Sequence, residues 1–352
     1  MNLDLAIKKA EKAALLWLFQ CHKNAEEKGF AHSRMNFLPE FCAWRKPYPE
    51  TTGYIIENFL SFNKTVLPNS ERIALRSADW LISIQSEEGF FYSGLNNKRP
   101  SFFNTAQIIF GLNQAYVYTG HHKYLSAINK AKYWLLSCLK EDGLCNSGLY
   151  MESFYATYYT RAIWPLLLVC DEDEKQKPIK SLYLLWNNKL ENDCFQNLGF
   201  GPGQNFLSHT LLYALEGFWE SSLLIKDELI TNKIFNIVEM LSSKILSEKS
   251  LFGMYNQNWK AVAKMKCLTG QAQMVSLLFK LLKHQDHETL KDAAFFLLEE
   301  MLNWQRISDR PSIHGSFPAS LPVWSHYFPF QSVNWTNKFF LDAVYHYHKV
   351  NK

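Results

Sequence analysis

The residues best suited to chemistry in this chain lie in short polar clusters, each of which stands immediately before a long apolar run. The first cluster is Glu50-Thr-Thr52, and five more follow at 103–107, 157–161, 208–210, 268–271 and 334–338. Together they offer a carboxylate, a histidine, an arginine, tyrosines and amides. These are groups that exchange protons with a substrate and neutralise its charge.

This set suits β-elimination or C5 epimerisation of a uronic acid sugar. Arg161, with an amide such as Asn104, would neutralise the sugar carboxylate, and His209 or Tyr159 would remove the adjacent proton. The candidate catalytic residues are therefore His209, Tyr159, Arg161 and Glu50. The candidate substrate-binding residues are Asn104, Gln107, Tyr54, Tyr158, Gln271, Trp324, Asn334 and Lys338.

Several of these candidates also have a purely structural interpretation. His209 would serve equally as a helix cap or a hydrogen-bonded core histidine. Tyr158 and Tyr159 would simply line a wall, although an aromatic wall also stacks sugars. Arg161 has few acidic residues nearby in the sequence, so its guanidinium needs a carboxylate or phosphate from elsewhere. Lys338 would either bind an anion or cap the cavity rim.

Two other functions stay open. A glycoside hydrolase usually needs two carboxylates about 5–10 Å apart, and Glu50 with Glu152 or Glu216 would supply such a pair. A non-catalytic glycan-binding or scaffold protein would use the same polar and aromatic side chains without chemistry. Glu50 stands out among the acids, because it is the one acid that the repeat puts at the rim of the mouth, facing an otherwise basic and amide-rich set.

An internal repeat of about 55–60 residues positions these clusters. Each unit has a charged amphipathic helix, a turn with glycine and an aromatic residue, and then an apolar helix. The amphipathic helices are expected at 5–22, 70–85, 122–139, 175–190, 228–246 and 288–304. The apolar helices are expected at 52–62, 104–118, 155–169, 207–224, 269–282 and 335–348.

Six such pairs predict an all-α fold, an (α/α)6 toroid with six inner and six outer helices and short loop insertions, as one domain over residues 1–352. The apolar helices must be buried on both sides, and the amphipathic helices must form the outer shell. An open solenoid would not explain inner helices so short of charge. Because the inner helices run parallel, their starts meet at one mouth that favours anions.

Two segments outside the helices attract attention. The loop 316–333 holds three prolines and several aromatic residues, among them Trp324, and would be either a lid or a plug that closes the ring. The acidic run Asp171–Glu174 is expected to be a solvated turn at the end away from the mouth.

The composition excludes other classes. A net charge of +4 without a basic stripe argues against nucleic acid as a partner. The charged first residues predict no secretion signal, and the apolar runs are too short to span a membrane. The seven cysteines form no Cys-x-x-Cys pair, which favours reduced thiols in the cytoplasm. We expect neither a metal nor another cofactor.

The turn pattern resembles the prenyltransferase and squalene-oxidase repeat, in which a Trp-Leu helix runs into Gln, an acidic residue, Gly and an aromatic residue. The best copy is Ala78–Phe90, and a second combines Ala131–Leu136 with Glu141–Gly143. This resemblance implies the toroid fold. The acidic motifs of triterpene cyclases and terpene synthases and the zinc ligands of protein prenyltransferases have no counterpart, so we set terpenoid chemistry aside.

A second resemblance covers most of the chain. The segments Tyr48–Ile56, Phe103–Leu112, Tyr158–Arg161 and Asn334–Phe340 are similar to repeat proteins found among bacterial polysaccharide-biosynthesis proteins. That resemblance implies surface-glycan metabolism, with an acidic oligo- or polysaccharide as the partner and glycan-synthesis enzymes as further partners. Polysaccharide lyases with an α/α toroid are similar in residue type, since they use Asn, His, Arg and Tyr.

Overall fold

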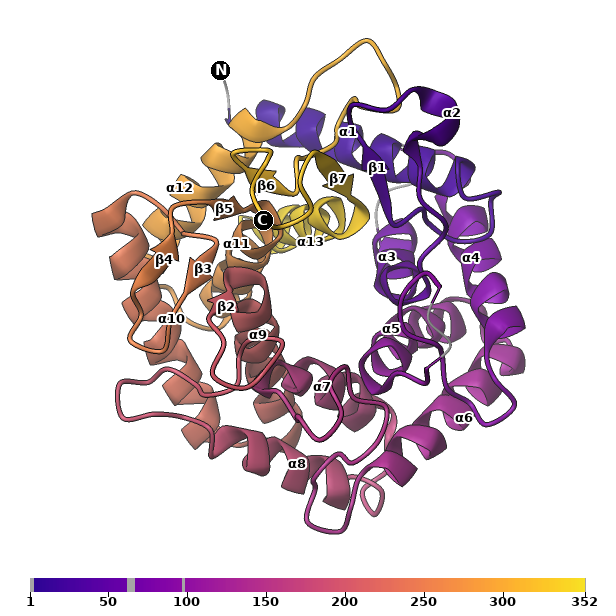
Figure 1. The fold of residues 1–352 in the computed structure, drawn as a ribbon, viewed down its shortest axis with the longest axis vertical. Coiled ribbons are helices and arrows are strands. Elements are labelled where there is room, and N and C mark those ends of the chain that lie inside the picture. Colours follow the sequence, from indigo (N-terminus) through magenta and orange to yellow (C-terminus); the bar gives the residue numbers. More distant parts are fainter. Residues whose placement is uncertain (1–2, 62–66, 97–98, 352) are drawn as a thin grey trace.

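The computed structural model describes residues 3–61, 67–96 and 99–351, which form a closed ring of paired helices (Figure 1). The outer helices are α1 (Leu3–Lys23), α4 (Ser70–Ile84), α6 (His122–Cys138), α8 (Gln176–Trp186), α10 (Glu228–Glu248) and α12 (Glu288–Trp304). The inner helices are α3 (Pro49–Ser61), α5 (Phe102–Thr119), α7 (Thr160–Val169), α9 (Ser208–Ile225), α11 (Leu268–His284) and α13 (Asn334–Val350). The predicted (α/α)6 toroid is confirmed, and the ring closes where α13 packs against α1 and α3.

The burial of each helix follows its sequence pattern. The inner helix α11 is buried without interruption from Leu268 to Phe279, as its apolar composition requires. The outer helix α4 buries only one face, which includes Ile73, Ser77 and Leu81, at the spacing of one helical turn. The hydrophobic core therefore lies between the two rings of helices and continues into the inner ring.

Glycine allows neighbouring inner helices to approach closely. A Cβ atom on Gly111 of α5 would lie 2.0 Å from the carbonyl oxygen of Gly53 in α3, and one on Gly53 would lie 2.6 Å from the Cα of Ile108. Only a residue without a side chain fits at such a contact. The glycine that follows Thr51 and Thr52 is thus explained by helix packing.

Two threonines near the helix starts bond to the preceding turns and do not cap their own helices. Thr52 Oγ1 accepts the backbone N–H of Phe30 at 3.0 Å, and Thr105 Oγ1 accepts that of Phe91 at 2.9 Å. The cap of α5 is Ser101, whose hydroxyl accepts the N–H of Asn104 at 3.1 Å. These threonines instead tie the incoming Gly-aromatic turn to the inner helix that follows it.

Short antiparallel strands lie at the end of the ring where the inner helices begin. They are β1 (Ser33–Met35), β2 (Phe206–Leu207), β3 (Met254–Tyr255), β4 (Ala261–Ala263), β5 (Lys266–Cys267), β6 (Ser320–Leu321) and β7 (Gln331–Val333). The pairings are β1 with β7, β2 with β3, β3 with β4, and β5 with β6. Since β6 and β7 belong to the loop 316–333, this loop joins the last repeat to the first.

Two elements fall short of their predicted ranges. The inner helix α7 begins at Thr160 and not at residue 155, because the chain before it forms a short 3₁₀ helix, η1 (Thr157–Tyr159). A further short helix, α2 (Glu40–Ala43), adds a single turn before α3. The outer helix α8 ends at Trp186, four residues before the end predicted from the sequence.

In the described part of the chain, no helix has the length and apolar character needed to cross a membrane.

Candidate active site

A cavity of about 640 Å³ opens at the end of the ring where the inner helices start. Six of the predicted site residues line it: Glu50, Tyr54, Asn104, Tyr158, Tyr159 and His209. They come from the first or second turns of α3, α5 and α9 and from η1. The parallel direction of the inner helices thus brings together side chains from segments more than 150 residues apart, as predicted.

Glu50 is the one carboxylate among the described residues that line the cavity. It lies in the first turn of α3, and the hydroxyl of Tyr48 donates a hydrogen bond to its Oε2 at 2.9 Å. Burial raises the pKa of Glu50 to about 7, although the Tyr48 hydrogen bond and the charge of Arg161 partly oppose this shift. At neutral pH this side chain can therefore either give or take a proton.

His209 lies in the first turn of α9 and is held by a single polar contact. Its Nδ1 pairs with Oε1 of Gln273 at 2.7 Å, and because an amide oxygen only accepts, Nδ1 carries the proton. The lone pair on Nε2 is then left to accept a proton. Burial lowers the pKa of His209 to about 4, so the ring is neutral at pH 7.

Aromatic rings surround these two groups. The ring centroid of His209 lies 4.3 Å from that of Tyr213, and Tyr158 stacks on Tyr159 with centroids 4.9 Å apart. The hydroxyl of Tyr159 accepts the backbone N–H of Tyr150 at 2.8 Å, and burial raises the pKa of Tyr159. A neutral tyrosine that already accepts a hydrogen bond is a poor base, so Tyr159 fits a wall position better than the catalytic role suggested for it.

Asn104 lines the cavity from α5, where its Nδ2 donates to the carbonyl oxygen of Tyr92 at 3.2 Å. Its amide oxygen is available to a sugar hydroxyl in that orientation. Tyr54, in the second turn of α3, is likewise part of the cavity wall, and its ring lies 5.7 Å from that of Phe339. Both residues lie in the cavity wall, and their role in substrate binding stays a prediction.

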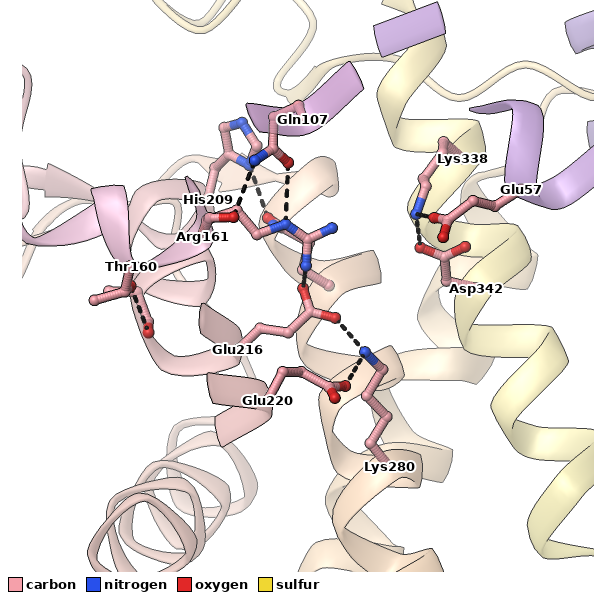
Figure 2. Close-up of polar contacts among 12 residues, drawn as sticks. Glu57, Gln107, Thr160, Arg161, His209, Glu216, Glu220, Lys280, Lys338 and Asp342 are labelled. Carbon is pink, nitrogen blue, oxygen red and sulfur yellow. Dashed lines mark hydrogen bonds and ion pairs between the residues drawn. The ribbon is translucent and has the colours of Figure 1, made fainter. Parts of the chain in front are cut away.

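Arg161 does not line the cavity, contrary to the role assigned to it from the sequence. It is buried below the cavity floor, where its Nη1 forms an ion pair with Oε2 of Glu216 (Figure 2). Its backbone carbonyl accepts Nε2 of Gln107 at 3.0 Å, and its Nε donates to Oε1 of Gln107 at 3.3 Å. The guanidinium therefore has a protein carboxylate as its partner, and Gln107 is occupied in holding it.

The ion pair of Arg161 belongs to a larger set of buried charges, which we call the lumen network. Lys280 binds Oε1 of Glu216 at 2.6 Å and Oε1 of Glu220 at 2.6 Å. On the other side of the ring Lys338 pairs with Asp342 and lies 3.8 Å from Glu57 (Figure 2). Lys338 is thus neutralised inside the ring. The sequence had suggested instead that it binds an anion or caps the cavity rim.

Three other predicted binding residues also lie outside the cavity. Gln271 is buried and donates through Nε2 to the carbonyl oxygen of Leu297 and to Glu300, at 3.2 Å each. Nδ2 of Asn334 donates to the carbonyl oxygen of Ala31 and to Thr51 Oγ1, at 2.9 Å each. Trp324 is 67% exposed and lies beyond the residues that line the cavity.

The structure adds cavity residues that the sequence did not single out. Tyr213 stands one helical turn after His209, and Tyr48 lies two residues before Glu50, so both were within reach of a periodicity argument. His32 comes from the loop before β1, where its ring lies 4.7 Å from that of Trp335, and no local signal marked it. Tyr327, from the loop 316–333, also lines the cavity, which shows that this loop forms part of the wall.

The second carboxylate of a conventional glycosidase is not found in the described cavity lining. Glu216 lies in the lumen network, where burial tends to raise its pKa but the charges of Arg161 and Lys280 lower it to about 2. Glu152 is exposed and does not line the cavity. Within the described residues, no group of three or more His, Cys, Asp or Glu side chains is arranged to hold a metal ion.

Several solved structures share this fold. The chain is similar to cellobiose 2-epimerase from Bacillus thermoamylovorans B4167, with a TM-score of 0.75 and 13% identity over 98% of this chain and 100% of that one. It is similar to an unsaturated glucuronyl hydrolase specific for heparin, with a TM-score of 0.72 and 14% identity over 99% and 98%. The chain is also similar to an alpha-amylase from Clostridium perfringens, with a TM-score of 0.69 and 13% identity over 96% of this chain and 97% of that one.

At such low identities these similarities establish the α/α toroid and leave the chemistry to be argued from the cavity itself. No protein-family model matches the chain, and no curated protein sequence matches it.

Proposed function

We propose that this chain is a carbohydrate-active enzyme that moves protons on a sugar bound in the cavity, by C5 epimerisation or β-elimination of an acidic saccharide. The observation that carries the proposal is the pairing of two unlike proton-transfer groups in one aromatic cavity. Glu50 has a pKa of about 7, and His209 is neutral with a free lone pair on Nε2. The names of the similar structures, which include an epimerase and a glucuronyl hydrolase, support a saccharide as the ligand.

The reaction begins with removal of the proton from the carbon next to the sugar carboxylate. Ionised Glu50 or the free nitrogen of His209 takes this proton, and the electron pair of the broken C–H bond moves into the carboxylate as an enolate. Epimerisation is completed when Nε2 of His209 has taken the first proton and Glu50, in its protonated form, returns a proton to the opposite face of the same carbon. β-Elimination is completed when the pair forms a C=C bond and the neighbouring C–O bond breaks, with a proton passing to the leaving oxygen.

Substrate binding is attributed to the walls of the cavity. Tyr54, Tyr158 and Phe103 offer ring faces that stack on the apolar faces of sugars. Arg99 is exposed at the mouth and is the one residue with a permanent positive charge among the described residues that line the cavity. We assign to Arg99 and Asn104 the role of holding the sugar carboxylate, because the lumen network occupies Arg161.

The biological setting is part of the same proposal. A role in bacterial surface-glycan metabolism in the cytoplasm, alongside glycan-synthesis enzymes, rests on the resemblance of segments such as Tyr48–Ile56 and Phe103–Leu112 to polysaccharide-biosynthesis proteins. The prenyltransferase-like repeat at Ala78–Phe90 supports only the architecture.

Hydrolysis is a second candidate, because two of the similar structures carry the names of hydrolases that act on saccharides. In this cavity it would have to proceed with Glu50 as the single carboxylate, since Glu216 is bound to Arg161 and Lys280. The products separate the two candidates: hydrolysis gives new reducing ends without an unsaturated sugar and without exchange at C5.

The test is to incubate the enzyme in D₂O with oligosaccharides prepared from alginate, polygalacturonate and heparin. We expect deuterium at C5 by NMR or ultraviolet absorbance of an unsaturated product, and loss of either signal in Glu50→Gln. Glu152→Gln is the matched control, because this exposed carboxylate lies outside the cavity. Full activity in Glu50→Gln, or reducing ends without exchange or unsaturation, would overturn the proposal.

A further inference from the structure

Most exposed aromatic side chains lie in the segments that connect an outer helix to the next inner helix. Eleven Phe, Tyr and Trp side chains in the described residues are exposed. Seven of them lie in the segments that lead from an outer helix to the next inner helix, and these segments surround the mouth (Figure 1). The other four, Tyr118, Tyr133, Tyr183 and Trp304, lie within helices.

Three of the seven come from neighbouring loop backbones, and we call them the rim platform: Phe37, Trp324 and Phe330. The rings of Phe37 and Phe330 meet at 89° with centroids 6.0 Å apart. The backbone N–H of Phe330 donates to the carbonyl oxygen of Val323 at 2.7 Å, so the backbone next to Trp324 passes close to Phe330. Phe37 is 64% exposed and Trp324 is 67% exposed, so water covers most of both rings.

The rim platform continues directly from the cavity wall. Phe328 lines the cavity, with its ring 5.1 Å from that of Trp335 and 5.5 Å from that of His32. Phe330 stands two residues further along the same loop. The rim platform and the cavity wall therefore share this loop.

The backbone of this loop is strained at both phenylalanines. Phe328 has a φ of 49° and Phe330 a φ of 57°, a left-handed conformation that large side chains rarely adopt. The surrounding pairings hold it in place: the backbone N–H of Asn36, next to Phe37, donates to the carbonyl oxygen of Phe330 at 2.9 Å. The result is that one ring is turned into the cavity and the other onto the rim.

We propose that the rim platform binds sugar residues of a glycan chain that extends out of the cavity, so that the substrate is an oligo- or polysaccharide. Flat, exposed rings next to a carbohydrate cavity offer the stacking surfaces that pyranose rings use. This inference rests on the proposed function and deepens it, because it states the size of the substrate. A free monosaccharide bound in the cavity would not need Trp324 or Phe330, which lie outside the cavity lining.

The experiment is affinity electrophoresis of the full chain in gels that contain alginate, polygalacturonate, hyaluronan or heparin. We expect at least one polymer to retard the wild type, and the double variant Trp324→Ala/Phe330→Ala to bind that polymer at least tenfold more weakly. Tyr118→Ala is the matched control, because Tyr118 and Phe330 are both 44% exposed while Tyr118 lies at the opposite end of α5. We expect it to migrate like the wild type.

Circular dichroism and thermal unfolding check that the double variant folds, and Trp324→Ala alone serves if it does not. Wild-type protein that no polymer retards, or a double variant retarded as strongly as the wild type, overturns the inference. Glu50→Gln separates this result from the proposed function, since we expect it to be retarded normally without catalysis. Retention without chemistry in the wild type would refute the proposed function alone, and chemistry on short oligosaccharides without retention would refute the rim platform alone.

Discussion

Two regions of the ring contain glutamates whose pKa values shift in opposite directions: Glu50 in the cavity is half-buried, and Glu216 in the lumen network is buried. In the cavity, Glu50 accepts a hydrogen bond from the Tyr48 hydroxyl, and burial raises its pKa to about 7. In the lumen network below, Glu216 contacts both Arg161 and Lys280, and its pKa falls to about 2. The difference lies in the cations within reach, because desolvation acts in the same direction on both carboxylates.

This contrast separates charge that holds the ring from charge that can do chemistry. A carboxylate with a pKa of about 2 stays ionised and stabilises neighbouring cations on α7 and α11, whereas one with a pKa near 7 can transfer protons at neutral pH. The guanidinium of Arg161 also lies 5.7 Å from the ring centroid of Tyr213, which lines the cavity. The lumen network thus contacts the cavity wall through Arg161 and Tyr213.

The substitution Glu50→Gln tests most strongly whether Glu50, unlike Glu216, takes part in the chemistry. General acid–base catalysis contributes on the order of 10²–10⁴-fold to a rate, so we expect turnover to fall by about that factor. Stability should hold, because glutamine keeps an acceptor for the Tyr48 hydroxyl and carries no buried charge. Steady-state kinetics and urea unfolding measure both effects; turnover within tenfold of the wild type would contradict the assignment.

The opposite pattern is expected for Arg161→Met. Removing one partner of a buried ion pair costs about 3–5 kcal/mol of unfolding free energy, because Glu216 loses its closest cation. The double variant Arg161→Met/Glu216→Met should recover part of this loss. Urea unfolding of both variants provides the measurement. A loss below about 1 kcal/mol in the single variant would show that the pair is not needed to hold the ring.

A pH series sharpens the same contrast. The folded-state pKa of Glu50 is raised, so its protonated form contributes stability that is fully present below its ordinary pKa of 4.5 and is lost as pH rises through 7. Relative to Glu50→Gln, the wild type should therefore lose roughly 2–3 kcal/mol between pH 4.5 and pH 8. Urea unfolding of both proteins measures this difference, and His209 affects both proteins equally. A constant difference would contradict the raised pKa.

The smallest expected effect concerns the support of His209. Gln273→Leu removes the amide oxygen that fixes the proton on Nδ1 of His209. Loss of such a supporting hydrogen bond typically costs about 10-fold or slightly more, so we expect a fall of about tenfold in kcat with little change in KM. Gln273→Glu, which restores an acceptor, should recover part of the rate. An unchanged kcat in Gln273→Leu would argue for a purely structural histidine.

The fold was predictable because the hydrophobic pattern of each repeat indicates which of its helices is fully buried and which is buried on one face only. The apolar character of α11 and the one-sided pattern of α4 fix the inner and outer positions, and the predicted helices agree with the structure within a few residues at most ends. The short strands at the mouth were not predicted, since segments of two or three residues carry no periodicity.

The cavity position of a side chain was predictable only where it lies near its own helix start, as with Glu50 and His209. Arg161 was misjudged because its partners are distant in the sequence: Gln107 lies 54 residues before it and Glu216 55 residues after it. That separation is the repeat length, so aligning the repeats would have put these three side chains side by side. His32 comes from a loop outside any period, and only the closed ring brings it to the cavity.

The central claim is that Glu50 titrates near neutrality in this cavity. A ¹³C NMR titration of protein labelled at the glutamate side chains, with Glu50→Gln to assign the resonance, measures this pKa directly. The account predicts a value of about 7 for Glu50, while the resonance of Glu216 shows no titration above pH 4. A pKa of Glu50 below about 5, as for an ordinary exposed carboxylate, would contradict it.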